Sequence, residues 1–370
     1  MKKLYLVTLS MLVFAVATLA SNLTDDFTKG TPEIKSIGSL AFGPEGLLFI
    51  GDSQAATIFA IDFADTAPNY EKARLEIKEI DEKIASMLGT TTKDIRIHDL
   101  AVNPISQNAY LSVSRGDGNN AAHVLLRITP AGHIEEVSLK NIKYSKKEIS
   151  NPVSLEAKTR RGRSLRVDAI TDLLYTEGEI FIAGLSNEEF SSTLRAVTFP
   201  FDEKEAASSL EIFHAAHRRY ETNAPIRTFL AYEFGNSPHL LAAYTCTPLV
   251  SFPIAGLKEG AHLKGKTVAE LGSGNRPLDM ILYKNKDKEY ILLANSNRTL
   301  MKIDPADIEK QEEGLTEPVT ERYGTAGVKY LAVAQVGVLQ IDNLNDDYIL
   351  ALQRMSNGSL NLRSLPKARL

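Results

Sequence analysis

The sequence is short of cysteine, of excess charge and of long apolar segments, and each shortage excludes a class of protein. Cys246 is the only cysteine among 370 residues, so no internal disulfide can form and the core must provide the stability alone. Lysine and arginine number 42 against 46 aspartate and glutamate, a balance that disfavours nucleic acid and anionic membrane surfaces as partners. Beyond the N-terminus no segment reaches the roughly 18 apolar residues of a membrane helix, so we expect no further membrane span.

Several motifs of catalysis are also missing. The chain has no GxSxG, no P-loop and no HExxH. The glycine-rich turn at 272–276 leads into an apolar strand, so it lacks the helix N-terminus that a phosphate cradle uses. A Ser–His–Asp triad stays open, because geometry rather than spacing defines it. The sequence therefore indicates a binding site but no particular reaction, and it does not decide whether the protein is an enzyme.

The first 20 residues have the pattern of a secretory signal peptide. Lys2 and Lys3 precede an apolar run over 4–19, which ends in small residues. A transmembrane anchor is the alternative, but the run is short for a span and polar residues follow it. We expect a signal peptide at 1–20, a mature chain at 21–370, and secretion to a periplasm or to the extracellular space.

Six copies of one strand pattern occupy the rest of the chain. Each copy has three short apolar or alternating strands joined by tight turns, and a looser fourth strand often follows. The copies span 36–62, 97–129, 169–199, 225–254, 275–304 and 337–365. Repeated four-stranded antiparallel units are typical of a β-propeller. We expect a single all-β propeller domain with six blades, or seven if 329–336 belongs to a further blade instead of the outer edge of the fifth.

Two other segments complete the predicted ring. Helical spacing over 79–88, followed by Gly89, predicts a helical insertion near 79–89. The last copy supplies only three strands, so we expect the N-terminal segment 32–37 to provide its fourth strand. Closure of the ring in this way removes exposed sheet edges. We expect the protein to be a monomer.

The first copy contains PEGLLFIGDS at 44–53, which resembles the strand–turn–strand pattern of secreted NHL and gluconolactonase-type (SMP-30-like) propellers. That resemblance implies a propeller fold and an oxygen-rich metal site, which cannot be mapped onto this chain residue by residue. The segments RRGRSLR, GLSNEEF, AYTCTPLV, NRPLDM and ANSNR also resemble a group of secreted bacterial proteins, a likeness that implies no particular function.

Unusual polar residues gather on the loops that lead into the inner strands and on the hairpin tips between second and third strands. In a propeller both kinds of loop meet at one mouth of the central channel, and binding residues concentrate on such loops. The candidate ligand-binding residues are Arg163, Arg166, Tyr220, Arg227, Asn275, Arg276, Asn295 and Arg298. Because arginine forks grip carboxylate and phosphate, we expect a small polar or anionic ligand there. For Asp99, Asp172 and Asp279, which recur at inner-strand starts, we favour a structural role between blades.

His214, His217 and Cys246 form a second candidate set. Histidines at i and i+3 share one side of a helical turn, and the cysteine lies on the next hairpin tip. A His2Cys set suits zinc with an open position, or copper, and calcium is the further possibility that the lactonase resemblance adds. The alternative function is therefore a metal-dependent enzyme, either a lactonase-like hydrolase or a copper oxidoreductase. A third hypothesis is a scaffold that docks another secreted protein and does no chemistry.

Overall fold

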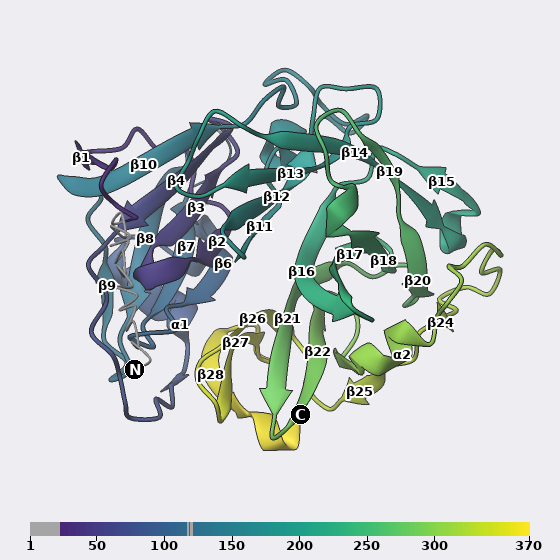
Figure 1. Ribbon diagram of the computed structural model, residues 1–370. Helices are drawn as coiled ribbons and strands as arrows, with labels where there is room; N and C mark the ends of the chain where they lie inside the picture. The colour runs from purple at the N-terminus through teal and green to yellow at the C-terminus, as the bar shows by residue number, and fades with distance from the viewer. Residues whose placement is uncertain (1–22, 117, 119–120) are drawn as a thin grey trace, which may run out of the picture.

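The computed structural model describes residues 23–116, 118 and 121–370, and the expected signal peptide lies outside them. Six separate β-sheets stand around a ring (Figure 1), which confirms a six-bladed β-propeller. The two α-helices of the described part are α1 (Ile80–Met87), within the predicted helical insertion, and α2 (Pro305–Glu309). Among these residues no helix combines the length and apolarity needed to cross a membrane.

The sheets are numbered here by the order of their inner strands in the sequence and described from the channel outward. Blade one consists of β2 (Leu40–Phe42), β3 (Leu48–Asp52), β4 (Thr57–Asp62), β10 (Ile142–Glu148) and β1 (Thr28–Gly30). Blade two consists of β6 (Ile95–Val102), β7 (Ala109–Arg115), β8 (Ala122–Ile128) and β9 (Ile134–Glu136). Blade three consists of β11 (Asp172–Thr176), β12 (Glu179–Leu185), β13 (Ser192–Thr198), β14 (Ala206–His214) and β15 (Arg219–Glu221), with β19 (His262–Lys264) parallel to β14.

The remaining three blades have the same plan. Blade four consists of β16 (Ile226–Phe234), β17 (Ser237–Tyr244), β18 (Pro248–Pro253), β20 (Lys266–Glu270) and β24 (Ala326–Gly327). Blade five consists of β21 (Pro277–Asn285), β22 (Lys288–Asn295), β23 (Leu300–Ile303) and β25 (Leu331–Val333). Blade six consists of β26 (Val338–Asn343), β27 (Tyr348–Arg354), β28 (Leu360–Pro366) and β5 (Glu76–Ile77). Because β25 pairs with β23, the segment 329–336 belongs to blade five and forms no seventh blade.

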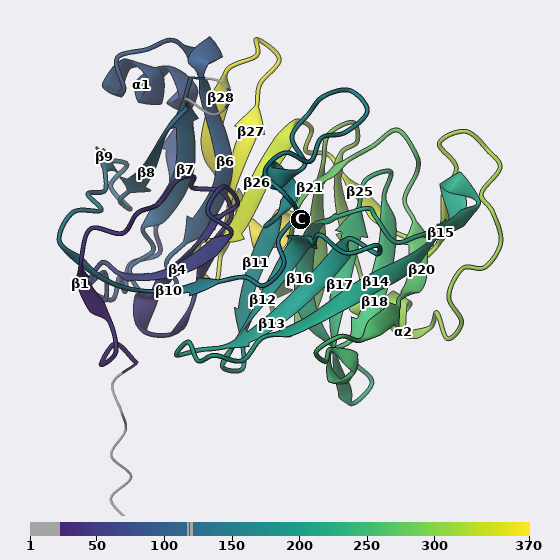
Figure 2. The same cartoon turned by 90° about the horizontal axis from the view of Figure 1, so that it is seen from above.

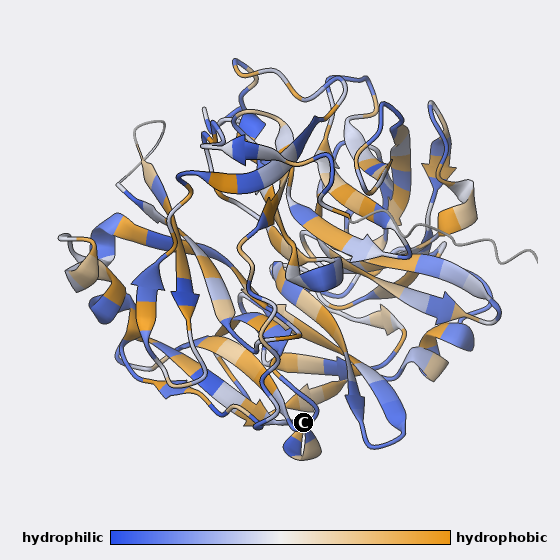
Figure 3. Ribbon diagram, turned by 60° about the vertical axis from the view of Figure 1, so that its left-hand side comes forward, coloured by the Kyte–Doolittle hydropathy of each residue, from blue (hydrophilic) through white to orange (hydrophobic). Residues whose placement is uncertain are grey.

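The core is a series of apolar layers between neighbouring sheets. The middle strands are hydrophobic while the loops are polar (Figure 3), and β3 is buried along its whole length because sheets cover both of its faces. One layer joins blades four and five through Leu241, Val268 and Leu293, and the other five pairs of neighbouring blades share comparable layers. Burial of these layers is the main favourable term in folding, as expected for a chain without a disulfide.

The order of blades around the ring differs from their order in the sequence. The inner strand β6 of blade two lies between β26 of blade six and β2 of blade one, and β2 in turn contacts β11 of blade three. The chain thus leaves blade one, builds blade two on the far side, and returns to add β10 to the outside of blade one. Blade six therefore lies next to blade two, whereas the sequence predicted that it lies next to blade one.

Ring closure is also achieved by another segment than expected. A strand from the N-terminal part of the chain does complete blade six, but it is β5 (Glu76–Ile77), paired with β28, and not the segment 32–37. The helix α1 follows β5 and packs beside β28 (Figure 2). Asp81 of α1 accepts the backbone N–H of Leu360 at 2.9 Å, which anchors the helix to this blade. The segment 32–37 forms no strand and is held by Asp52 through the N–H of Lys35 and the hydroxyl of Ser36.

Aspartates on four inner strands connect neighbouring blades. One carboxylate oxygen accepts the next residue's N–H, and the other accepts an N–H of the adjacent inner strand. The donors across the blades are Leu40 to Asp99, Phe229 to Asp172, Ile341 to Asp279 and Val102 to Asp342. The structural interpretation of these residues is thereby confirmed, with Asp342 as a fourth member. Burial is the largest cause of their raised pKa values, about 7 for Asp172 and about 6 for Asp342.

Candidate metal centre and channel mouth

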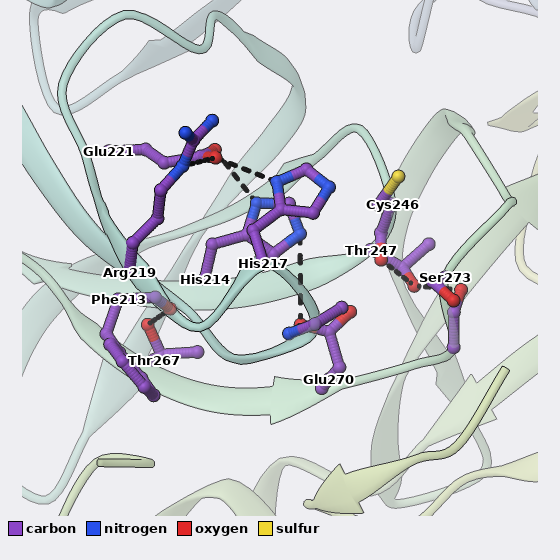
Figure 4. A network of polar contacts seen from close by, with 12 residues as sticks. Phe213, His214, His217, Arg219, Glu221, Cys246, Thr247, Thr267, Glu270 and Ser273 are labelled. Atoms are coloured by element: carbon purple, nitrogen blue, oxygen red, sulfur yellow. Dashed lines mark hydrogen bonds and ion pairs between the residues drawn. The ribbon is translucent and has the colours of Figure 1, made fainter. Parts of the chain in front are cut away.

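A tight hairpin at the end of blade three brings two histidines together. His214 ends β14, a single 3-10 turn over Ala215–His217 follows, and β15 returns alongside β14. Arg218 adopts a left-handed conformation with φ 59°, which lets the chain reverse within one turn. As a result the rings of His214 and His217 lie with their centroids 3.7 Å apart (Figure 4). The i, i+3 spacing thus places both on one side, as expected.

Glu221, at the end of β15, orients both imidazoles. Its two oxygens lie 2.9 Å from Nδ1 of His214 and 2.7 Å from Nδ1 of His217. Burial alone would raise the pKa of Glu221, but hydrogen bonds from the two histidines and from Arg219 outweigh it and lower the pKa to about 2. With each Nδ1 engaged, Nε2 is the nitrogen left to bind a ligand. A carboxylate behind the ring nitrogen is the usual support of a metal-binding histidine.

Cys246 reaches this pair from the β17–β18 hairpin of blade four. Its backbone N–H donates to the carbonyl of Asn275 at 2.9 Å, and the Thr247 hydroxyl donates to the carbonyl of Gly272 at 2.8 Å. Both Cys246 and Thr247 have positive φ, 66° and 67°. Such a conformation is unfavourable for side chains other than glycine, and especially for a β-branched threonine. The backbone strain is retained here at the residue that carries the thiol.

The ligand atoms of His214, His217 and Cys246 all lie within 4.8 Å of one another. A tetrahedral zinc ion, with bonds of about 2.0 Å to nitrogen and 2.3 Å to sulfur, keeps its ligand atoms roughly 3.3–3.6 Å apart. The three atoms therefore need to move together by only about 1 Å to share one ion. The convergence is formed by two blades, since the histidines belong to blade three and the cysteine to blade four.

Glu270 was not predicted to belong to this site. It ends β20, is fully buried, and places Oε2 4.0 Å from Nε2 of His214 (Figure 4). His214 Nε2 and Glu270 Oε1 have no hydrogen-bond partner among the described residues. Burial is the main reason that the pKa of Glu270 rises to about 7, and the charge of Glu221 adds to the effect. A glutamate at the end of the apolar stretch KTVAEL was the signal in the sequence that could have indicated it.

The mouth of the channel is a separate cavity of about 320 Å³, bordered by Arg227 and Arg276 among others. Arg227 forms an ion pair with Asp168 at 3.0 Å, and Arg163 contacts the same carboxylate. Arg276 has no such partner: within the described part of the chain no hydrogen bond or ion pair of its guanidinium is found. Partial burial and then the charge of Arg227 lower the pKa of Arg276. His98 also borders the cavity, and burial lowers its pKa to about 4.

The other predicted ligand-binding residues lie elsewhere. Arg166 is buried and donates to the carbonyls of Val153 and Gln54. Asn275 and Asn295 are buried and bonded to each other at 2.8 Å. These three therefore support the loops rather than face the channel.

Two further candidates lie on other surfaces. Arg298 borders a neighbouring hollow with Tyr323. Tyr220 is 47% exposed on β15, where the Lys264 amine lies 3.7 Å from its ring centroid. The structure thus brings Arg163, Arg227 and Arg276 together. Asn275 adjoins Arg276 but is buried in the loop, and the other four lie elsewhere.

The two candidate sites are distinct but joined through the Cys246 turn. None of His214, His217 and Cys246 borders the channel cavity. However, Arg227 Nε donates to the hydroxyl of Thr245 at 3.1 Å, and Cys246 is bonded to Asn275, the residue before Arg276. The hairpin tip that carries the thiol is therefore fixed on one side by Arg227 and by Asn275, the neighbour of Arg276.

Comparisons with known proteins assign this chain to no family. No protein-family model matches the sequence, and no curated protein is significantly similar to it. One similar solved structure is from Thermus thermophilus and is provisionally described as an oxidoreductase (glucose dehydrogenase); it has 10% identity, a TM-score of 0.36, and coverage of 92% of this chain and 99% of that one.

Two structures of the full extracellular region of plexin A4 are also similar to this chain. Each has 8% identity and a TM-score of 0.37 over 92% of this chain, which spans 40% and 47% of theirs. At such identities and TM-scores no activity is transferred to this chain.

Proposed function

We propose that this propeller binds one transition-metal ion through His214, His217 and Cys246. The observation that supports the proposal is the convergence of the three ligand atoms within 4.8 Å, at a place where His214 Nε2 is buried and lacks a partner among the described residues. A ligand ion would engage that nitrogen. Glu221 supplies the outer support, and Glu270 is the candidate for a fourth ligand.

The donor atoms favour zinc or copper over calcium. Two imidazole nitrogens and one thiolate are the ligands that zinc and copper prefer, whereas calcium takes oxygen ligands at six to eight positions. Held by His214, His217 and Cys246 alone, zinc would keep an open fourth position for water or substrate, and coordination by Glu270 would close it. Copper would exchange electrons. The two ions thus correspond to the hydrolase and the oxidoreductase alternatives.

Metal analysis tests this proposal. The full chain, purified without a histidine tag, is incubated with Zn²⁺, Cu²⁺ or Ca²⁺, dialysed, and its metal content is measured by mass spectrometry. We expect one Zn²⁺ or Cu²⁺ per chain, a visible thiolate charge-transfer band with Cu²⁺, and no retained Ca²⁺. Cys246→Ala and His217→Ala should abolish retention, whereas His133→Ala, at an exposed histidine remote from the cluster in sequence, should not. Metal-free wild-type protein would contradict the proposal.

A second candidate function is the binding of a small anion at the channel mouth. The Arg276 guanidinium has no partner among the described residues and is repelled by Arg227 and Arg163, so an anion would relieve the repulsion. The aspartates that border the same cavity have both oxygens on backbone N–H groups. The Arg276 guanidinium is therefore the charged group at this cavity that we expect to bind an anion.

Thermal-shift measurements with citrate, phosphate and glucose test this second proposal. We expect stabilisation by an anion, lost in Arg276→Gln and weakened by salt, and retained in Arg160→Gln, a control at an exposed loop arginine. Stabilisation by none of the three compounds, or stabilisation that Arg276→Gln leaves unchanged, would argue against it.

We also propose that the protein is exported, on the basis of the pattern at 1–20. Expression of the full chain in a bacterial host, followed by fractionation and N-terminal sequencing, tests this. A mature N-terminus near residue 21 in the periplasm or medium is the expected result, and an intact N-terminus in the cytoplasm would contradict it.

A further inference from the structure

A larger cavity, of about 560 Å³, lies on blade three away from both candidate sites. It is bordered by the β12–β13 hairpin tip, by strands β13 and β14, by residues 150–151, and by the loop that precedes β19. Its volume lies within the range of small-molecule sites in proteins, about 300–1,000 Å³. None of the residues considered so far for ligand or metal binding borders it.

Arg195, on β13, forms the buried polar group of this cavity. It is 1% exposed, its Nε lies 3.1 Å from Glu205 Oε1, and its Nη2 donates to the carbonyl of Ser150 at 3.1 Å. Its Nη1 and its Nε both have no hydrogen-bond partner among the described residues, although Nε is ion-paired with Glu205. A buried hydrogen-bond donor without a partner costs free energy. A ligand with a hydrogen-bond acceptor would therefore bind favourably at Arg195.

Carboxylates on the surrounding loops favour a ligand that donates hydrogen bonds. Glu188 has one oxygen bonded to Asn151, and Glu259 has one bonded to the N–H of Ala207, which leaves the other oxygen of each available. The carboxylate of Glu189 has no hydrogen bond in the described part of the chain. Because Glu205 already balances Arg195, the cavity lining carries a net negative charge. Anionic ligands are therefore disfavoured.

Phe190 adds a flat apolar surface at the edge of the cavity. It is 40% exposed, and its ring packs at 4.7 Å between centroids against His262, which Ser209 holds at 2.8 Å. This contact connects the two loops that border the cavity. One face of the aromatic ring is thus supported by protein while part of the ring stays accessible to a ligand.

We propose that this cavity binds a neutral saccharide, with the sugar ring against Phe190 and its hydroxyls shared between Arg195 and the glutamates. A hydroxyl both accepts and donates hydrogen bonds, so it meets the needs of Arg195 and of the carboxylates together. An anion would satisfy only Arg195, and an ammonium group only the carboxylates. The apolar C–H face of a sugar suits an exposed aromatic ring at a site with few other apolar groups.

An array of immobilised glycans tests the proposal with the purified full chain. The probes are neutral trisaccharides (maltotriose, cellotriose, mannotriose), the anionic sialyllactose, and cationic glucosamine oligomers. The tightest neutral ligand is then titrated calorimetrically against the wild type, Phe190→Ala and Glu259→Gln. Tyr323→Ala is the matched control, because this tyrosine is similarly exposed, at 49%, but lies outside the cavity. Circular dichroism and thermal melts verify that each variant is folded.

We expect neutral glycans to bind and both cavity variants to weaken binding about tenfold or more, with Tyr323→Ala and Arg276→Gln unchanged. The proposal is overturned if no neutral glycan binds, if only the charged probes bind, or if both cavity variants bind like the wild type. Loss of binding in Arg276→Gln alone would assign the sugar to the channel mouth and would equally overturn it.

Discussion

His214 Nε2 and Glu270 Oε2 face each other across 4.0 Å inside the protein, where blades three and four meet. The imidazole nitrogen and the second carboxylate oxygen, Glu270 Oε1, are both buried without a hydrogen-bond partner among the described residues. Each such group costs about 1–3 kcal/mol, and folded proteins keep few of them. A cation between the two side chains would offset both costs at once.

Replacing Glu270 by glutamine separates the effect of this carboxylate on stability from its effect on metal binding. In the metal-free protein at pH 8 we expect the free energy of unfolding to rise by about 1 kcal/mol, since a buried charge is removed. In the presence of Zn²⁺ we expect the affinity for the ion to fall about tenfold or more, because a ligand is weakened. Urea denaturation with chelator and with Zn²⁺ measures both. Higher stability with unchanged metal affinity would remove Glu270 from the coordination sphere.

Glu221→Gln is expected to lower metal affinity by about 10–100-fold while the fold persists. The carboxylate holds Nδ1 of both histidines, so its loss frees the rings to rotate. Competition with a chromophoric chelator gives the affinity. Glu211→Gln serves as the control, because Glu211 also contacts a histidine, His262, away from the cluster. Equal affinities for the two variants would contradict the positioning role.

Cys246→Gly should make the protein more stable and unable to bind metal. Glycine accepts the φ of 66° at this position without strain, for a net gain of up to about 1 kcal/mol after its greater unfolded-state entropy is counted. Cys246→Ser is the control, since it keeps the strain and loses the thiol. Thermal melts and metal analysis of both variants provide the measurement. A glycine variant no more stable than the serine variant would show that the turn is unstrained.

Because of the buried channel aspartates, we expect the free energy of unfolding to fall as pH rises, whereas most carboxylates make a protein less stable as pH falls. Burial raises the folded-state pKa of Asp172 to about 7 from an ordinary 3.8, so between these values the folded state holds a proton that the unfolded chain has lost. The contribution of Asp172 to the free energy of unfolding therefore falls as pH rises from about 4 to 7. It should change by at most about 1.4 kcal/mol per pH unit.

The comparison of wild type with Asp172→Asn isolates this contribution, because other carboxylates are common to both proteins. Urea denaturation at pH 5, 6, 7 and 8 should show the wild type losing stability relative to the variant up to about pH 7, with little further change above it. A difference that stays constant with pH would show that Asp172 is ionised throughout.

The repeats predicted the blade number and the inner aspartates because both depend on local pattern. Hydrophobic alternation and turn residues recur in each copy, and HDL, TDL and LDM stand at the same place in their strands. The outer strands were harder to predict, because β5 has only two residues and the paired residues of β10 and β4 are 81 to 91 positions apart. Neither pairing leaves a local signal, so the sequence could not distinguish β5 from the segment 32–37 as the strand that closes the ring.

The candidate site shows the same contrast between local features, which could be predicted, and contacts between blades, which could not. The i, i+3 histidines and the hairpin thiol were predictable because the turn and the hairpin are local. Glu270 joins them only through packing between two blades. Tyr220 was predicted at the channel mouth, but β15 places its ring beside Lys264 instead. Arg166 was indistinguishable in sequence from its neighbour Arg163, yet one is buried on carbonyls and the other exposed beside Asp168.

The position of β5 has a consequence for how the chain folds during synthesis. Because β5 pairs with β28 and the inner strand β6 packs on β26, blade two gains its second neighbour, and the helix after β5 its packing partner, only when residues 338–366 have been made. A ribosome releases the N-terminal quarter of this protein long before its partners exist. Until then β5 and α1 have no sheet to pack on, so a chain truncated before residue 360 is expected to leave these two elements open to proteolysis.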